Sequence, residues 1–198
     1  NMKKIFIIPT VRKRYKNQIE YCIDKRIFFL LKKVFKKFEI KSELHKSINL
    51  IIILGGNNLI SIEKNQENAI KEQLSNRAFI FGSRNKIPIL GICGGAQFLA
   101  KKYGSRIVRT ISHVGSHSII WNSKNIFLKK VKLPKVINSY HDYKIIKLSN
   151  NLSLHAYAKD ESVEFFSNKI NKIYGIMWHP ERNKSIKKFD IELLKKIK

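Results

Sequence analysis

Residues 89–97 read ILGICGGAQ, and this segment gives the clearest indication of the fold class. An apolar segment of strand length runs directly into Cys93, which glycines bracket on both sides, and helical spacing begins at Ala96. A buried strand that turns sharply into a helix is the repeating unit of α/β proteins. The stretch therefore predicts an α/β fold that displays Cys93 at the end of a strand.

Cys93 has the surroundings of a nucleophile elbow, in which a tight strand-to-helix turn holds one side chain in the open. Gly94 and Gly95 are unfavourable at the start of a helix unless another group must approach closely. The positive end of the following helix favours the thiolate, and the N–H of Gly94 can help to hold an oxyanion. The alternative is a buried structural cysteine. We apply that interpretation to Cys22, which has no adjacent glycine and falls within a predicted helix.

Outward from this stretch, apolar strands and amphipathic helices alternate. Buried strands are predicted at residues 3–8, 48–54, 87–92 and 173–178. Helices are predicted at residues 19–38, 63–74 with an extension toward 81 left open, 96–103 and 185–197. This alternation predicts a flavodoxin-like parallel sheet with helices on both faces.

Between these elements, short β-type runs recur with polar turns between them. They lie at residues 118–121, 126–131, 136–139, 154–158 and 163–166. We interpret them as a small antiparallel addition to the parallel sheet. One domain spanning residues 2–198 is expected, with Asn1 taken as a remnant of the expression vector.

The sequence IMWHPE at residues 176–181 ends the last predicted buried strand. In a parallel sheet the carboxyl ends of the strands meet at one edge, so His179 is expected to reach Cys93. An imidazole can take the thiol proton and return it to a leaving nitrogen, while Glu181 fixes its tautomer. The sequence therefore predicts a triad of Cys93, His179 and Glu181.

Other histidines offer competing interpretations. His141, in the segment SYHD, resembles a His-Asp pair but lacks the strand-end context, and we assign it to a substrate wall or a structural loop. His113 and His117 are conceivable metal ligands, yet no third ligand stands at a suitable spacing in the sequence. We therefore expect no metal ion and no cofactor.

The formal net charge of +26 raises the alternative of a non-enzymatic nucleic-acid-binding protein. The lysines are scattered, however, and neither a zinc-finger spacing nor an RNA-binding aromatic motif is present. We interpret the charge as compositional drift that could still attract an anionic substrate. No apolar run is long enough to span a bilayer, and the two cysteines and the absence of a visible signal peptide favour the cytoplasm.

At these residues the sequence resembles the class I glutamine amidotransferase-like family. Four segments carry the resemblance over most of the chain: LGGNNL at 54–59, GICGGAQ at 91–97, NSYHD at 138–142 and HPE at 179–181. The resemblance implies attack by Cys93 on a γ-glutamyl carbonyl and a glutamyl thioester intermediate. It further implies roles for two sets of residues. The oxyanion hole would involve Gly56 and Gly94, and the substrate would contact Asn57, Gln97, Ser139, Tyr140 and His141.

Within the family, the sequence looks closer to stand-alone γ-glutamyl hydrolases than to amidotransferases bound to a synthetase. Glu20, Asp24 and Arg26 are similar to a signature of one branch, whose substrates include γ-glutamyl-γ-aminobutyrate and γ-glutamyl-CDP-amidate, the latter in capsule biosynthesis. The resemblance makes Glu20 and Arg26 candidate substrate contacts and favours the nucleotide-linked substrate. The alternative for these charges is a solvated helix face. A glutaminase subunit that passes ammonia to a synthetase also remains open.

Overall fold

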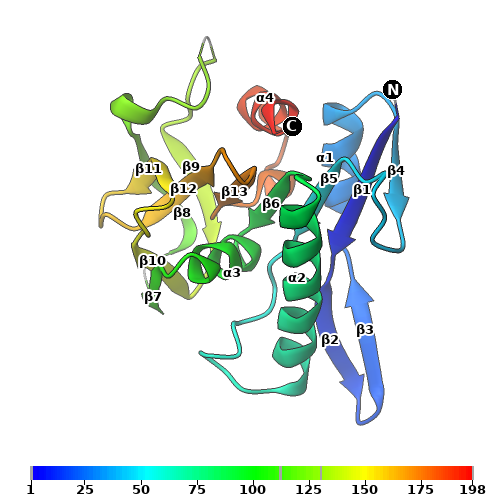
Figure 1. Cartoon of the computed structure of the whole chain (residues 1–198). Coiled ribbons are helices and arrows are strands. Elements are labelled where there is room, and N and C mark those ends of the chain that lie inside the picture. Colours follow the sequence, from blue (N-terminus) through cyan, green and yellow to red (C-terminus); the bar gives the residue numbers. More distant parts are fainter. Residues whose placement is uncertain (1, 112, 130, 198) are drawn as a thin grey trace.

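The structure is a computed structural model that describes residues 2–111, 113–129 and 131–197 (Figure 1). Within these residues the main sheet contains nine strands: β1 (Lys3–Ile8), β4 (Phe38–Lys41), β5 (Leu50–Ile53), β6 (Ile89–Ile92), β8 (Val114–Trp121), β9 (Val136–Tyr140), β11 (Ser153–Ala158), β12 (Val163–Asn168) and β13 (Ile173–Ile176). Two smaller sheets pair β2 (Thr10–Tyr15) with β3 (Gln18–Cys22), and β7 (Arg106–Arg109) with β10 (Tyr143–Lys147). The helices are α1 (Lys25–Val34), α2 (Gln66–Arg84), α3 (Gly94–Lys102) and α4 (Lys188–Lys196), and short 3-10 turns are η1 (Ser123–Asn125) and η2 (Pro180–Arg182).

The main sheet is parallel on one side and antiparallel on the other. Its order is β4-β1-β5-β6-β13-β12-β11-β8-β9, and the strands from β4 to β13 pair in parallel. From β13 to β9 every pairing is antiparallel. This order confirms the predicted α/β fold with a parallel centre and an antiparallel addition.

Isoleucine-rich sequence explains the parallel half. All residues of β5, β6 and β13 are buried, because helices cover both faces of the sheet there. In register, Ile8 lies opposite Ile53, and Ile92 lies opposite Ile176. The carboxyl ends of these strands therefore meet at one edge, which is where Cys93 and His179 follow.

The helices form two layers (Figure 1). Helices α1 and α4 pack against one face through residues such as Leu31 and Leu193, in a core that includes Ile52. Helices α2 and α3 pack against the opposite face through Ala78 and Leu99. Within the described parts of the chain, no helix is both long and apolar enough to cross a membrane.

The predicted helix at residues 19–38 is wrong over both of its ends. Residues 18–22 form β3, which pairs with β2 in a hairpin, and residues 38–41 form β4. The helix begins only at Lys25, because the Asp24 side chain accepts a hydrogen bond from the Arg26 N–H at 3.0 Å and caps the first turn. Glu20 consequently lies on the hairpin, where it pairs with Arg14, and Cys22 ends a strand.

The predicted strand at residues 126–131 is also wrong: its described residues lie outside every helix and strand of the structure. Phe127 and Leu128 are both buried although they are adjacent, and Phe127 packs against the ring of Phe165. In a strand with only one face in the core, buried and exposed residues alternate, and two adjacent buried residues do not fit this pattern. This segment fills the core as a loop.

Candidate active site

Cys93 stands at the turn between β6 and α3. Its φ of +53° and ψ of −110° place it in a backbone region that side-chain-bearing residues rarely adopt. Its N–H donates to the carbonyl of Ile176 at 2.8 Å, and its own carbonyl accepts the N–H of Gln97 at 3.0 Å. The elbow is thus fixed between the neighbouring strand β13 and the first turn of α3.

Two glycines of the elbow are required by close backbone packing. A Cβ atom on Gly91 would lie 2.5 Å from the carbonyl oxygen of Gly95. A Cβ atom on Gly95 would overlap the carbonyl group of Ile53 in the neighbouring strand. The sequence predicts that another group approaches Gly95 closely, and that group is the backbone of β5.

His179 and Glu181 lie beside Cys93, at the carboxyl end of β13. His179 Nδ1 is 2.7 Å from Glu181 Oε1, and both side chains are buried. Burial lowers the pKa of His179, but hydrogen bonding and charge at Cys93 and Glu181 outweigh it and raise that pKa to about 9. The three residues of the predicted triad therefore lie together at the carboxyl ends of β6 and β13.

Asn138 holds the backbone of His179 from the side of β9. Its Nδ2 donates to the His179 carbonyl at 2.7 Å, and its Oδ1 accepts the His179 N–H at 2.8 Å. Asn183 Oδ1 accepts a second bond from the same Nδ2 at 3.0 Å. No role for Asn138 follows from the sequence, because only the pairing of β9 near η2 makes the contact visible.

A hollow of about 180 Å³ opens in front of Cys93. Its lining comes from the glycine turn after β5, the elbow and the loop after β9: Gly56, Asn57, Asn58, Cys93, Gly94, Gln97, Tyr140, His141, Asp142 and Tyr143. Among the predicted substrate contacts, Asn57, Gln97, Tyr140 and His141 are on this wall. Ser139 is not in the lining, since its hydroxyl donates to the His113 carbonyl at 2.5 Å beneath the loop.

The two predicted oxyanion-hole glycines, Gly56 and Gly94, both line this hollow. Gly56 has a φ of +88°, and Thr10 Oγ1 donates to the carbonyl of Gly55 at 2.8 Å, which anchors the turn. A Cβ atom on Gly94 would lie 3.0 Å from the Asn57 carbonyl oxygen, so turn and elbow pack directly together. Both glycines are therefore close enough to serve one small group.

The side chains of Asn57 and Gln97 are already engaged with backbone. Asn57 Oδ1 accepts the Val11 N–H at 2.8 Å, and its Nδ2 donates to the Val11 carbonyl at 2.9 Å. Gln97 Nε2 donates to the Tyr143 carbonyl at 2.8 Å. Both residues thus shape the hollow by fixing its walls, the first through β2 and the second through the loop after β9.

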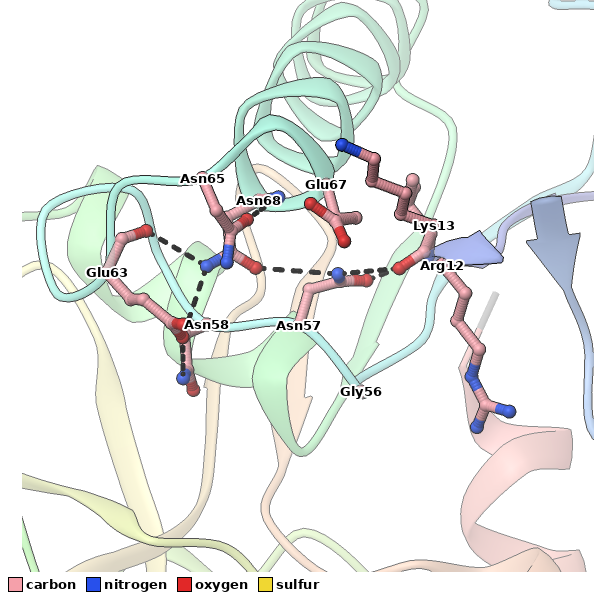
Figure 2. Close-up of a pocket in the computed structure, with 10 residues that line it drawn as sticks. Arg12, Lys13, Gly56, Asn57, Asn58, Glu63, Asn65, Glu67 and Asn68 are labelled. Carbon is pink, nitrogen blue, oxygen red and sulfur yellow. Dashed lines mark hydrogen bonds between the residues drawn. The ribbon is translucent and has the colours of Figure 1, made fainter. Parts of the chain in front are cut away.

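A second hollow of about 340 Å³ shares Gly56, Asn57 and Asn58 with the first. Its other lining residues come from β2 and from the start of α2: Val11, Arg12, Lys13, Glu63, Asn65, Glu67 and Asn68. Figure 2 shows Arg12 and Lys13 on the side of β2, with Glu63 on the opposite side beyond the asparagines. The two hollows therefore adjoin along Gly56, Asn57 and Asn58, and two exposed basic side chains, Arg12 and Lys13, line the second.

Glu20 and Arg26 lie apart from the hollow in front of Cys93. Glu20 Oε1 pairs with Arg14 Nη1 at 3.1 Å on the exposed hairpin. Arg26 Nη2 is 2.6 Å from Asp24 Oδ2, and this hydrogen bonding lowers the pKa of Asp24 to about 2. Arg26 also lines a separate hollow that reaches Glu181. Glu20 therefore lies on the β2–β3 hairpin, whereas Asp24 and Arg26 lie at the start of α1.

Comparison with known proteins gives a consistent result. The family model described as glutamine amidotransferase class-I matches residues 7–196. The γ-glutamyl-CDP-amidate hydrolase of Campylobacter jejuni is 33% identical over 159 residues, which cover 80% of this chain and 74% of that protein. The glutamine-hydrolyzing GMP synthase subunit of Methanococcus aeolicus is 34% identical over 142 residues, covering 70% and 68% respectively.

Solved structures agree on the fold. A protein of Thermoplasma acidophilum provisionally assigned as a GMP synthase subunit superposes with a TM-score of 0.71 at 20% identity, covering 100% of this chain and 92% of that one. A glutamine amidotransferase of Thermotoga maritima superposes with a TM-score of 0.64 at 17% identity, covering 91% and 76%.

Proposed function

The chain belongs to the class I glutamine amidotransferase family, and on that premise we propose that it hydrolyses a γ-glutamyl amide through Cys93, His179 and Glu181. The observation that carries this proposal is the position of His179, which bonds Glu181 through Nδ1 and interacts with Cys93 at the end of the adjoining strand. Residues 2–198 would act as one domain, in a reducing cytoplasm that suits a free thiol.

In the proposed reaction, the Cys93 thiolate attacks the γ-carbonyl carbon of the substrate. The carbonyl oxygen becomes an oxyanion that the backbone N–H of Gly94 and N–H groups near Gly56 would stabilise. As the C–N bond breaks, His179 gives its proton to the leaving nitrogen, which leaves a glutamyl thioester on Cys93. His179 then takes a proton from water, the hydroxide attacks the thioester, and glutamate leaves as the thiolate is restored.

The best specific candidate is γ-glutamyl-CDP-amidate, which would yield cytidine diphosphoramidate and glutamate for capsule biosynthesis. Its support is the Campylobacter jejuni relative, together with the second hollow, which shares Gly56, Asn57 and Asn58 with the first. In this arrangement the glutamyl group would lie before Cys93, and Arg12 and Lys13 would face the diphosphate. The overall charge of +26 would favour the approach of such an anion.

Two other substrates belong to the same chemistry. The relative from Methanococcus aeolicus, a GMP synthase component, supports a glutaminase that releases ammonia to a synthetase partner. A γ-glutamyl-γ-aminobutyrate-type hydrolase is a further alternative, whose leaving group lacks a diphosphate. The last alternative is a basic nucleic-acid-binding protein without catalytic activity, whose function would not depend on Cys93.

The decisive experiment measures glutamate release from glutamine, γ-glutamyl-γ-aminobutyrate and γ-glutamyl-CDP-amidate. We expect the nucleotide-linked substrate to have the highest kcat/KM and Cys93→Ala to remove all activity while the circular dichroism spectrum is kept. A nucleotide substrate no better than glutamine would remove the capsule proposal. Activity toward glutamine that appears only on addition of a synthetase would favour the ammonia-delivering role.

A further inference from the structure

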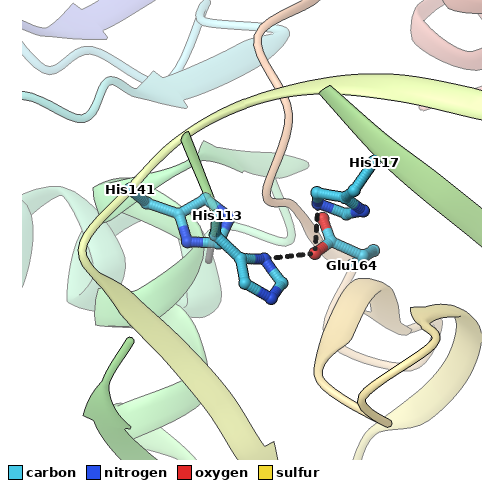
Figure 3. Close-up of side chains that lie close together, drawn as sticks. All are labelled: His113, His117, His141 and Glu164. Carbon is cyan, nitrogen blue, oxygen red and sulfur yellow. Dashed lines mark ion pairs between the residues drawn. The ribbon is translucent and has the colours of Figure 1, made fainter. Parts of the chain in front are cut away.

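Four side chains from separate segments converge behind the loop after β9 (Figure 3). His113 directly precedes β8, His117 lies within β8, His141 directly follows β9, and Glu164 lies in β12. One ligand-type atom from each residue lies within 4.8 Å of all the others. The sequence showed no third ligand near His113 and His117, because the fold supplies the other two from a distance.

Two distances in this cluster match the spacing of ligands around one small cation. Glu164 Oε1 is 3.3 Å from His117 Nε2 and 3.5 Å from His113 Nδ1. In a tetrahedral zinc site with bonds of about 2.0–2.1 Å, neighbouring ligand atoms lie about 3.4 Å apart. Small side-chain adjustments would therefore bring these atoms into one coordination sphere.

The inward-facing atoms of the cluster lack hydrogen bonds within the described residues. Those without a hydrogen-bond partner are His113 Nδ1, His117 Nε2, both ring nitrogens of His141 and both carboxylate oxygens of Glu164. Glu164 is 0% exposed and His141 is 5% exposed. Glu164 Oε1 lies at ion-pair distance from His113 Nδ1 and His117 Nε2, whereas Glu164 Oε2 and both His141 nitrogens have neither an ion pair nor a hydrogen bond among these residues. A buried polar atom without a hydrogen bond costs about 1–3 kcal/mol, so such a concentration in one place points to a missing ligand.

By contrast, the ring nitrogens of His113 and His117 that face away from Glu164 have carboxylate or carbonyl partners, as histidines in metal sites do. His113 Nε2 lies 3.0 Å from Asp160 Oδ2, and Asp160 is itself fixed by Lys144 Nζ at 2.7 Å and the Ser162 hydroxyl at 2.6 Å. His117 Nδ1 lies 3.1 Å from the Ser118 carbonyl oxygen. Donation of the outer N–H to a carboxylate or carbonyl leaves the inner nitrogen with a lone pair directed at the cluster.

We propose that His113, His117, His141 and Glu164 bind one Zn²⁺ ion in a closed, four-coordinate site. Imidazole and carboxylate ligands in a tetrahedral set suit Zn²⁺, and four protein ligands leave no open position for chemistry on the metal. The competing arrangement is an ion pair of Glu164 with protonated His113 and His117. That arrangement leaves His141 unpartnered, whereas a cation uses it.

The site would stabilise the wall of the hollow in front of Cys93. Tyr140 and His141 belong to that wall, while Glu164 belongs to β12, the strand of the antiparallel half that pairs with β13. A zinc ion would join the loop after β9 to β8 and β12. Its removal is therefore expected to raise KM severalfold more than it lowers kcat, since Cys93 and His179 are held by other contacts.

The direct test is the metal content of the untagged full chain, purified without chelator and measured by elemental mass spectrometry. We expect about one zinc per chain. After removal of the metal, titration with Zn²⁺ and Co²⁺ should restore one equivalent, with the visible absorption of tetrahedral Co²⁺. A wild-type protein that neither carries zinc nor binds added Zn²⁺ more tightly than the variants below would overturn the proposal.

Two variants test the ligands, a third tests Asp160, which holds His113, and one histidine serves as the control. Glu164→Gln and His117→Ala should weaken Zn²⁺ binding by a hundredfold or more, and Asp160→Asn by about 10–100-fold. His117 is 17% exposed at its side chain, so its loss should leave the fold intact, which circular dichroism can check. His45→Ala, at an exposed position away from the cluster, should bind like wild type. Equal zinc affinity in wild type, His117→Ala and Glu164→Gln would place the metal elsewhere and refute the assignment.

Discussion

His179 Nδ1 lies 2.7 Å from Glu181 Oε1, and the two side chains are 3% and 5% exposed. Because Glu181 accepts the Nδ1 proton, the other ring nitrogen is left to serve Cys93. Burial lowers the pKa of His179, but Cys93 and Glu181 together raise it to about 9. The imidazole is therefore expected to keep its proton throughout the neutral range, and in the proposed reaction this proton would pass to the leaving nitrogen.

The first prediction concerns the alkaline limb of the pH profile, the range in which kcat/KM falls as pH rises. As pH rises through about 9, His179 loses its proton and kcat/KM should fall. Glu181→Gln removes a charge that raises this pKa, so the limb should move to lower pH, and kcat should drop by about 10- to 1,000-fold. The measurement is the pH profile of kcat/KM for both proteins. An unmoved limb in the variant would mean that Glu181 does not act on His179.

The second prediction follows from the backbone at Cys93. A residue with a side chain at a φ of +53° and ψ of −110° carries about 1–3 kcal/mol of strain, which glycine relieves. Cys93→Ala and Cys93→Gly should both lose hydrolysis by about a thousandfold or more. Of the two, Cys93→Gly should be more stable by about 1 kcal/mol, despite the larger entropy that glycine loses on folding.

Urea unfolding of the two inactive variants measures this difference. Cys22→Ala is the matched control, because Cys22 lies at the end of β3 away from the elbow and should retain activity. If Cys93→Ala were as stable as Cys93→Gly, the elbow would not store strain at the nucleophile.

The strands and the elbow that could be predicted are those that the local sequence pattern specifies. Short runs without charged residues, rich in isoleucine, marked β5, β6, β13 and the second half of β1, since a strand buried on both faces has no polar alternation. Glycines around Cys93 marked the elbow, because close backbone approach leaves few other residues available. These two signals were sufficient to place Cys93 and His179 at one edge of the sheet.

The hairpin β2–β3 was missed for a physical reason. Residues 19–38 show apolar spacing that a helix and a short strand followed by a helix satisfy equally well. The distinction depends on the pairing of Val11 with Tyr21 and on the Asp24 cap. Likewise, Asn138 and Glu164 act through contacts 41 and 47–51 residues away in the chain, which no local spacing reveals.

The third prediction tests Asn138 as a residue that positions His179. Asn138→Ala leaves the buried N–H of His179 without its partner, at about 1–3 kcal/mol, and removes one of the two hydrogen bonds to the His179 carbonyl, which also accepts the Arg182 N–H at 3.1 Å. We expect kcat to fall by about 10–100-fold with a smaller change in KM, because the imidazole is misplaced while the hollow remains. Asn168→Ala, which breaks two exposed hydrogen bonds, one to the Asn151 carbonyl and one from the Asn171 N–H, is the control and should change neither constant. A variant that loses stability but keeps kcat would limit Asn138 to a structural role.

The last prediction separates the nucleotide-linked substrate from glutamine. Arg12 and Lys13 line the second hollow on exposed stretches of β2, beyond the shared wall of Gly56 and Asn57. A hydrogen bond from a charged donor is worth about 1.5–3 kcal/mol, so Arg12→Gln and Lys13→Gln should each raise KM for γ-glutamyl-CDP-amidate by about tenfold or more. Neither should change kcat/KM for glutamine, which has no diphosphate to meet these side chains. Lys16→Gln, at the exposed hairpin turn outside the hollow, is matched in charge and should leave KM unchanged. Equal effects of the three substitutions would show that only the overall positive field acts on the substrate, and that β2 provides no specific diphosphate contact.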